Sequence, residues 1–301
     1  MLRLLLVSVL VLCIAPRHAI SQELSPRAYW PAPTGTQIMT IGYAFTTGDI
    51  IPDPSLPVTG FDSDINALKI GYLRTLELFG RSSNLQLELP YANGRSSVAG
   101  PDDVQIERNY KGQGDITTTL SINLLGAPAM DAGGFAALRE SPRPILGASL
   151  KVVAPTGRYD ADRVLNVGAN RWAAKAELGY MQVLTSKWLL ESQAGLWLFA
   201  DNDNFLGARK QQDPIASVQF HLVRRFSPGF WGSINTSLYR GGRSRVAGVK
   251  LDDLQRDMKV GATLAFPVAR GHVVRVGYNT GSINDDDETF HELSLAYSRL
   301  F

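Results

Sequence analysis

The sequence predicts an all-β protein, a single antiparallel transmembrane β-barrel of about 12 strands with long external loops and mostly short periplasmic turns. Three observations predict this fold class. Segments of about ten residues alternate apolar and polar side chains, which gives each segment one apolar and one polar face. Long and short connections alternate along the chain, as they do in outer-membrane barrels. The last segment ends on an aromatic residue, Phe301, as the closing strand of such a barrel does.

The chain begins with a predicted secretory signal peptide, residues 1–21. Arg3 supplies the charged start, an apolar run continues to Ala15, and small residues at Ala19 and Ser21 suit cleavage after Ser21. The run is shorter than the ~20 apolar residues that a membrane-spanning helix needs. The only cysteine, Cys13, lies in this run, so we expect no disulfide in the mature chain. We expect a Gram-negative bacterial protein of the cell outer membrane, with the periplasm as the alternative.

The charge of the mature chain is balanced. The full sequence has 30 basic residues, and removal of Arg3 and Arg17 with the signal peptide leaves 28, against 28 acidic residues. A balanced chain offers no basic surface of the kind that binds nucleic acid, so we expect no nucleic-acid partner. The partners expected of a membrane barrel are outer-membrane lipid, lipopolysaccharide and a small-molecule solute. The oligomeric state is left open by the sequence.

Residues 22–34 form an extended, proline-rich segment ahead of the predicted barrel, residues 35–301. Pro26, Pro31 and Pro33 cannot donate backbone hydrogen bonds to a strand ladder, so this segment is not a strand. It either hangs on the periplasmic side or enters the lumen as a partial plug.

The first half of the barrel contains four predicted strands. In the third, Leu85, Leu87 and Leu89 fall on one face while polar residues fall on the other. Such half-polar strands differ from the continuous apolar runs of a parallel sheet. The four predicted strands are residues 37–46, 65–76, 84–92 and 115–124.

The second half adds eight strands, which brings the total to 12, an even number as in bacterial barrels. In the closing strand, Leu293, Leu295 and Tyr297 face one way and small or polar residues face the other. A lipocalin-like barrel or a sandwich would share this period, so a soluble protein is the alternative fold. The eight are residues 146–154, 171–183, 187–200, 215–226, 230–239, 257–266, 273–279 and 289–301.

The connections separate the two folds, because only the membrane barrel requires long and short connections to alternate. The predicted external loops are residues 48–64, 94–114, 156–170, 201–214, 241–256 and 281–288. The predicted short turns are residues 77–83, 185–186, 227–229 and 267–271. One connection on the turn side, residues 126–144, breaks the rule, and we expect a short helix over residues 131–140. Aromatic residues near the strand ends, such as Trp231, Tyr239 and Phe290, predict two belts at the membrane surfaces.

Several stretches resemble a known family. They are R-A-Y-W-P-A-P-T-G-T at 27–36, G-D-I-I-P-D-P-S-L-P at 48–57, N-V-G-A-N-R-W at 166–172 and F-A-D-N-D-N-F at 199–205. The chain is similar over nearly its whole mature length to the putative MetA-pathway of phenol degradation family. That resemblance implies an outer-membrane channel or transport-like barrel, with a link to the metabolism of aromatic compounds. It fixes no solute.

The candidate functional surface is the lumen wall. Strand parity turns ten charged residues inward, five of each sign, which favours cross-strand ion pairs or a weakly selective polar path over an ion-selective ring. At about 12 strands the pore is expected to be narrow. The lumen-facing candidates are Lys69, Glu88, Lys151, Lys175, Glu177, Glu191, Asp257, Lys259, Arg275 and Glu292.

The sequence favours no catalytic or metal site. None of His221, His272 and His291 has a serine two residues away on its own strand, so an outer-membrane hydrolase is a minor alternative. We expect no enzyme activity and no cofactor. Asp201 and Asp203 are weak candidates for a cation site, because acidic turn residues are more often only solvated.

We therefore expect passive passage of small solutes, with aromatic or hydrophobic compounds as a candidate class. The alternative is a non-conducting structural barrel, or one whose loops bind partners.

Overall fold

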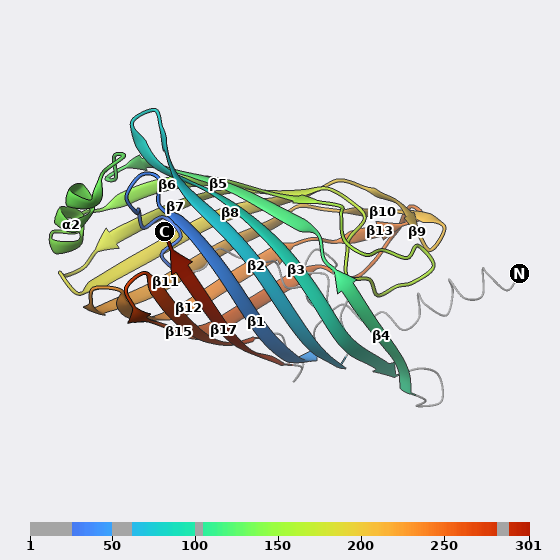
Figure 1. Ribbon diagram of the computed structural model, residues 1–301. Helices are drawn as coiled ribbons and strands as arrows, with labels where there is room; N and C mark the ends of the chain where they lie inside the picture. Colours follow the sequence, from blue (N-terminus) through green and yellow to red (C-terminus); the bar gives the residue numbers. More distant parts are fainter. Residues whose placement is uncertain (1–25, 50–61, 100–104, 282–288) are drawn as a thin grey trace, which may run out of the picture.

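The computed structural model describes residues 26–49, 62–99, 105–281 and 289–301, so the predicted signal peptide lies outside the described residues. The protein is a closed, antiparallel 12-stranded β-barrel, as the sequence predicts (Figure 1). The first and last strands close it, with a ladder that runs from Ile38 opposite Leu300 to Gly48 opposite Phe290. Thirteen strand segments form the 12 barrel strands, because β4 and β5 together make one of them. The segments are β1 (Gln37–Asp49), β2 (Asp62–Leu78), β3 (Arg81–Ala99), β4 (Gln105–Gln113), β5 (Ile116–Leu125), β6 (Ile145–Ala154), β7 (Ala173–Val183), β8 (Trp188–Phe199), β11 (Ile215–Ser227), β12 (Phe230–Gly241), β15 (Gln255–Ala269), β16 (His272–Gly281) and β17 (Phe290–Leu300).

The barrel is apolar outside and polar inside, the reverse of a soluble core. Leu87 and Leu295 on the outer face are 47% and 53% exposed, whereas Gln193 and Gln219 on the inner face are buried. The two-residue period of each strand produces this arrangement directly. Some inner polar groups bond one another, as the side chains of His221 and Asn235 do, whereas others, such as Gln193, have no hydrogen-bond partner among the described residues.

Strands β4 and β5 together form one barrel strand, interrupted at Gly114 and Asp115. The first part of β3, from Ser83 to Glu88, pairs with β5. From Tyr91 onward, β3 pairs with β4. Pro90, which has no N–H to donate, stands at the change of partner, and its carbonyl accepts a 2.9 Å bond from the Gly114 N–H. The interruption therefore coincides with a residue that cannot complete the ladder.

The prediction of a loop over residues 94–114 is wrong for most of that range. Strand β3 continues to Ala99 and β4 begins at Gln105, so a long hairpin extends the barrel wall. A row of inward hydroxyl groups supports the pairing: Ser96 bonds to Ser63 at 2.6 Å and to Tyr110 at 3.1 Å. The polar composition that favoured a loop belongs instead to strands with polar side chains on both faces.

Two other predicted loops carry a small sheet at the same end of the barrel, called here the loop end. Strands β9 (Asn202–Phe205), β10 (Ala208–Gln212), β13 (Ser244–Val246) and β14 (Val249–Lys250) pair in the order β14-β13-β10-β9. Figure 1 shows β9, β10 and β13 beyond the barrel strands.

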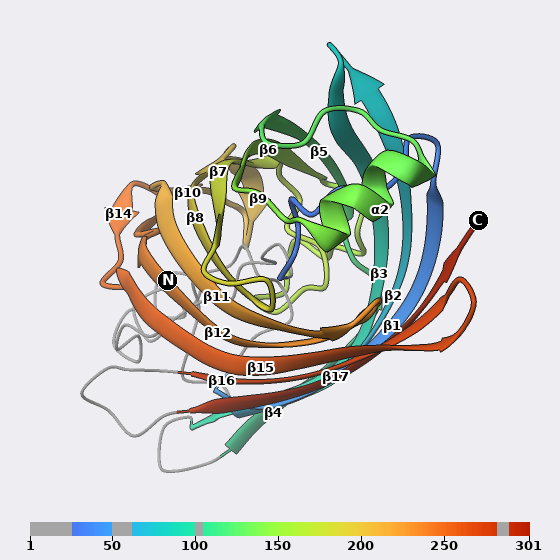
Figure 2. The same ribbon diagram turned by 90° about the vertical axis from the view of Figure 1, so that its left-hand side faces the viewer.

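The opposite end, called here the turn end, has tight turns and the expected helix. The turn between β2 and β3 has only Phe79 and Gly80 at its tip, both with positive φ, as a two-residue hairpin requires. Helix α2 (Ala132–Glu140) begins after Asp131, whose carboxylate accepts a 2.7 Å bond from the Gly134 N–H. Figure 2 shows α2 lying across this mouth of the barrel. Within the described ranges, no helix is long and apolar enough to cross a membrane.

Candidate functional site: the barrel lumen

The N-terminal segment enters the lumen. The backbone N–H of Arg27 donates a 2.7 Å bond to Glu191 Oε2 on β8, and Tyr29 is 5% exposed among residues of the barrel wall. Further along, the Thr34 N–H bonds to the Met130 carbonyl ahead of α2. Of the two placements that the sequence left open, the structure shows the one inside the barrel for residues 26–34.

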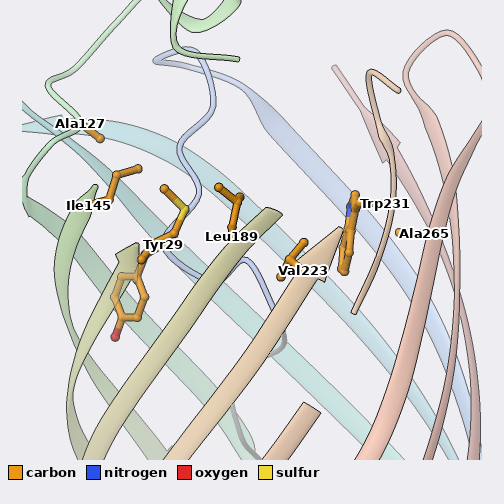
Figure 3. Packing of buried hydrophobic residues seen from close by; sticks show 8 residues of the cluster. Tyr29, Ala127, Ile145, Leu189, Val223, Trp231 and Ala265 are labelled. Atoms are coloured by element: carbon orange, nitrogen blue, oxygen red, sulfur yellow. The ribbon is translucent and has the colours of Figure 1, made fainter. Parts of the chain in front are cut away.

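Tyr29 occupies a slot built from two facing glycines. Gly147 on β6 pairs directly with Gly179 on β7, and both face inward. A Cβ atom added to either would lie 2.1 Å from the Tyr29 ring, so only glycine leaves room for the ring against the wall. The Tyr29 hydroxyl donates a 3.1 Å bond to Glu177 Oε1 and lies 3.0 Å from Ser149 Oγ. Figure 3 shows the ring lying against the inner side of the wall.

A buried ion pair lies next to the slot. Lys175 Nζ is 2.5 Å from Glu177 Oε2, and both side chains are almost completely buried. Gln219 Nε2 donates a 3.3 Å bond to the same carboxylate oxygen. Because each group is paired, the wall accommodates these charges without water, and they face no open space.

At the loop end, the connection between β6 and β7 crosses the lumen. Asp115 holds it: its two carboxylate oxygens accept bonds of 2.7 and 2.8 Å from the backbone N–H groups of Gly157 and Ala169. Leu165 and Val167 of this connection are buried in one cluster with residues of β2, β3, β4 and β17, so the cluster extends from the wall next to β6 as far as the closing strand. We call residues 155–172 the crossing loop.

Between the N-terminal segment and the barrel wall lies a cavity of about 1060 Å³. It is lined by the N-terminal segment, by α2, and by residues of β1, β2, β3, β5, β6, β11, β12, β15, β16 and β17. Of the ten charged candidates, six line it: Lys69, Glu88, Lys151, Lys259, Arg275 and Glu292. The other four, Lys175, Glu177, Glu191 and Asp257, are buried in the wall outside this lining. A functional role for these ten residues stays a prediction.

Basic residues outnumber acidic residues in the described lining of the cavity, whereas the ten candidates chosen by strand parity are five of each sign. Eight basic residues line it, because Arg27, Arg139, Arg225 and Arg270 join the four candidates of positive sign. Among the described residues, two acidic ones line it, and both have partners: Glu88 lies 2.8 Å from Lys69 Nζ, and Glu292 accepts a 2.9 Å bond from Asn279. Basic residues therefore predominate in the described part of the lining, which favours anions.

Sequence reasoning missed the aromatic part of the lumen. Trp231, Tyr239 and Phe290 were assigned to the outer belts, but they are buried with 6%, 4% and 7% exposure and point inward. An aromatic residue near a strand end can belong to an outer belt at the membrane surface, or it can face inward at a mouth of the lumen. Parity distinguishes the two, since Trp231 shares its face with the inward Ser233.

The histidines and the acidic loop residues form no recognised reactive group. His221 Nδ1 lies 2.9 Å from Asn235 Oδ1, and His291 lies 2.8 Å from the Tyr278 hydroxyl. Asp201 and Asp203 both contact Arg209, the latter at 3.2 Å, so a guanidinium stands where a cation would bind. Among the described residues, no group of three or more His, Cys, Asp or Glu could hold a metal ion. The acidic run at 285–287 lies outside them.

Comparison with known proteins agrees with the fold. The family model described as "Putative MetA-pathway of phenol degradation" matches residues 44–298. The structure is similar to the crystal structure of an outer membrane channel from Pseudomonas putida F1, with 23% identity, a TM-score of 0.75, and coverage of 93% of this chain and 100% of that one. It is less similar to the β domain of the Bordetella autotransporter BrkA, with 15% identity, a TM-score of 0.52, and coverage of 89% and 100%. No curated protein matches the sequence.

Proposed function

Because the chain belongs to the family described as "Putative MetA-pathway of phenol degradation", we propose that it is an outer-membrane channel for the passive passage of small solutes. The observation that carries this proposal is the cavity of about 1060 Å³ inside a closed barrel. That volume is close to the upper end of the range for sites that bind small organic molecules. Phenol and simple aromatic acids are the first solutes to test, given the name of the family.

The outer face of the barrel supports a membrane location. Rows of exposed Leu, Ile, Val and Tyr side chains cover the strands, and in water so large an apolar surface would aggregate. Lipid removes that cost, and outer-membrane lipid and lipopolysaccharide are therefore the proposed surroundings. The predicted export signal at residues 1–21 is consistent with this location in a Gram-negative cell.

A second candidate function follows from how the lumen is filled. Residues 26–34 occupy the turn end and the crossing loop spans the loop end. A barrel whose lumen holds segments of its own chain near both ends favours either a gated channel or a non-conducting barrel that acts through its surface loops. We propose no catalytic activity for either form.

Single-channel recording of the purified mature protein in a planar bilayer separates these functions. Discrete conductance steps that phenol or an aromatic acid blocks would support the channel. A folded barrel, shown by its heat-modifiable migration on gels, that gives no steps and no solute flux in vesicles would refute it.

A further inference from the structure

Four arginines line the cavity at the turn end of the lumen. We call Arg27, Arg139, Arg225 and Arg275 the arginine cluster; they come from the N-terminal segment, α2, β11 and β16 and all line the cavity. Among the ion pairs of the described residues, none involves a member of the cluster. Glu191, the acid that interacts with the Arg27 side chain, already accepts the Arg27 backbone N–H. Several cations gathered at one place attract anions.

Two tryptophan rings contact the guanidinium groups. The Cζ atoms of Arg27 and Arg225 are 4.5 and 5.4 Å from the centroid of the Trp30 ring. The Cζ atoms of Arg27 and Arg275 are 5.4 and 5.9 Å from the centroid of the Trp231 ring. Cation–π contacts of this kind stabilise a guanidinium and leave its N–H groups able to bond acceptors. Arg225 already donates from Nη1 to the Ser186 carbonyl at 3.0 Å and from Nη2 to the Arg139 carbonyl, so the N–H groups offered to a ligand are those of the other three arginines. Figure 3 shows Trp231 on the inner side of the barrel.

Arg27 is held in this position at a cost. Its φ of +68° is the left-handed conformation, which is unfavourable for a residue with a side chain. Burial, with Arg225 and Arg275 adding to it against the opposing effect of Glu191, lowers the pKa of the Arg27 guanidinium to about 10. Its Nε and that of Arg275 are buried and have no hydrogen-bond partner among the described residues. Buried donors without acceptors are costly, and a bound anion would satisfy them.

We propose that the arginine cluster is a binding site for the carboxylate of a small organic acid, with the rest of the molecule in the cavity. The planar guanidinium matches a carboxylate with two parallel N–H bonds, which favours this anion over a spherical one. Ala28, Pro31 and Val273 line the cavity nearby and suit an apolar or aromatic body. The inference deepens the proposed channel function, on which it rests, by naming an anionic solute class.

Binding of benzoate to the purified mature protein in nanodiscs at low salt tests the site, by calorimetry and by quenching of tryptophan fluorescence. Benzamide, which has the same shape without the charge, is the matched ligand, and acetate shows whether the ring contributes. We expect Arg275→Gln to weaken benzoate binding about tenfold or more, the effect of one charge-assisted hydrogen bond. Arg108→Gln, on the exposed hairpin at the loop end, is the matched control and should bind benzoate normally.

Equal binding of benzoate and benzamide, or equal binding by Arg275→Gln and Arg108→Gln, would overturn the proposed site. Heat-modifiable migration of each variant shows that it is folded, and Trp231→Phe provides a second variant that should weaken benzoate binding and reduce the quenching. The binding assay does not depend on conduction. Conductance without benzoate binding would refute the anion site and leave the channel, whereas benzoate binding without conductance would refute the channel and leave the site.

Discussion

The N-terminal segment should leave the lumen when its anchor is removed. Tyr29 is almost completely buried in the slot formed by Gly147 and Gly179, and its hydroxyl bonds to Glu177. Truncation of a buried aromatic ring to alanine costs roughly 3–5 kcal/mol. If ~3 kcal/mol of that loss weakens the docking of the N-terminal segment, Tyr29→Ala lowers the ratio of docked to released segment by about a hundredfold.

Trypsin measures that release directly, because Arg27 is a cleavage site within the segment. In the wild type the Arg27 N–H bonds to Glu191 and the bond after it is protected inside the barrel. We expect mass spectrometry to show rapid loss of residues up to 27 from Tyr29→Ala, together with higher or noisier conductance. Tyr29→Phe keeps the ring in the slot and should resemble the wild type more closely. Cleavage and conductance of Tyr29→Ala that match those of the wild type would show that the slot does not hold the segment.

Three further variants test the filling of the lumen. Asp115→Ala removes both carboxylate bonds to the crossing loop, about 3 kcal/mol in total, so amide hydrogen exchange in that loop should accelerate while the barrel strands stay protected. Lys175→Met removes the ion-pair partner of Glu177 and should lower the unfolding free energy in urea by about 3–5 kcal/mol. The double variant with Glu177→Gln should recover much of this lost stability, and no recovery would contradict the pairing. Gly179→Val fills the slot and should release the segment as Tyr29→Ala does, with an unchanged tryptic pattern as the opposing result.

The strands and their faces follow from the sequence because alternation is a local property. All 12 predicted strands are present, and the outward Leu293 and Leu295 are exposed as expected. The helix ahead of β6 is also confirmed, since Asp131 caps it through a bond only three residues away. The hairpin of β3 and β4 was missed, because a strand with polar residues on both faces has no alternating pattern to recognise.

The charge of the cavity could not be predicted in the same way. Parity places Lys151 and Glu191 equally on the inner face, but it does not say which inward side chains are covered. The N-terminal segment covers Glu191 and leaves Lys151 at the cavity. Counting inward charges therefore predicted a balanced lumen, whereas basic residues outnumber acidic ones among the described residues that line the cavity.

The sequence alone determined the barrel, its strand number and its apolar exterior, because each depends on neighbours a few residues apart. Only the tertiary structure decided what fills the lumen. Tyr29 meets Ser149 across 120 residues of sequence and Glu177 across 148, and the arginine cluster is assembled from four separate elements. Such contacts depend on how the closed barrel folds its own N-terminus inward, and no periodicity in the chain encodes that step.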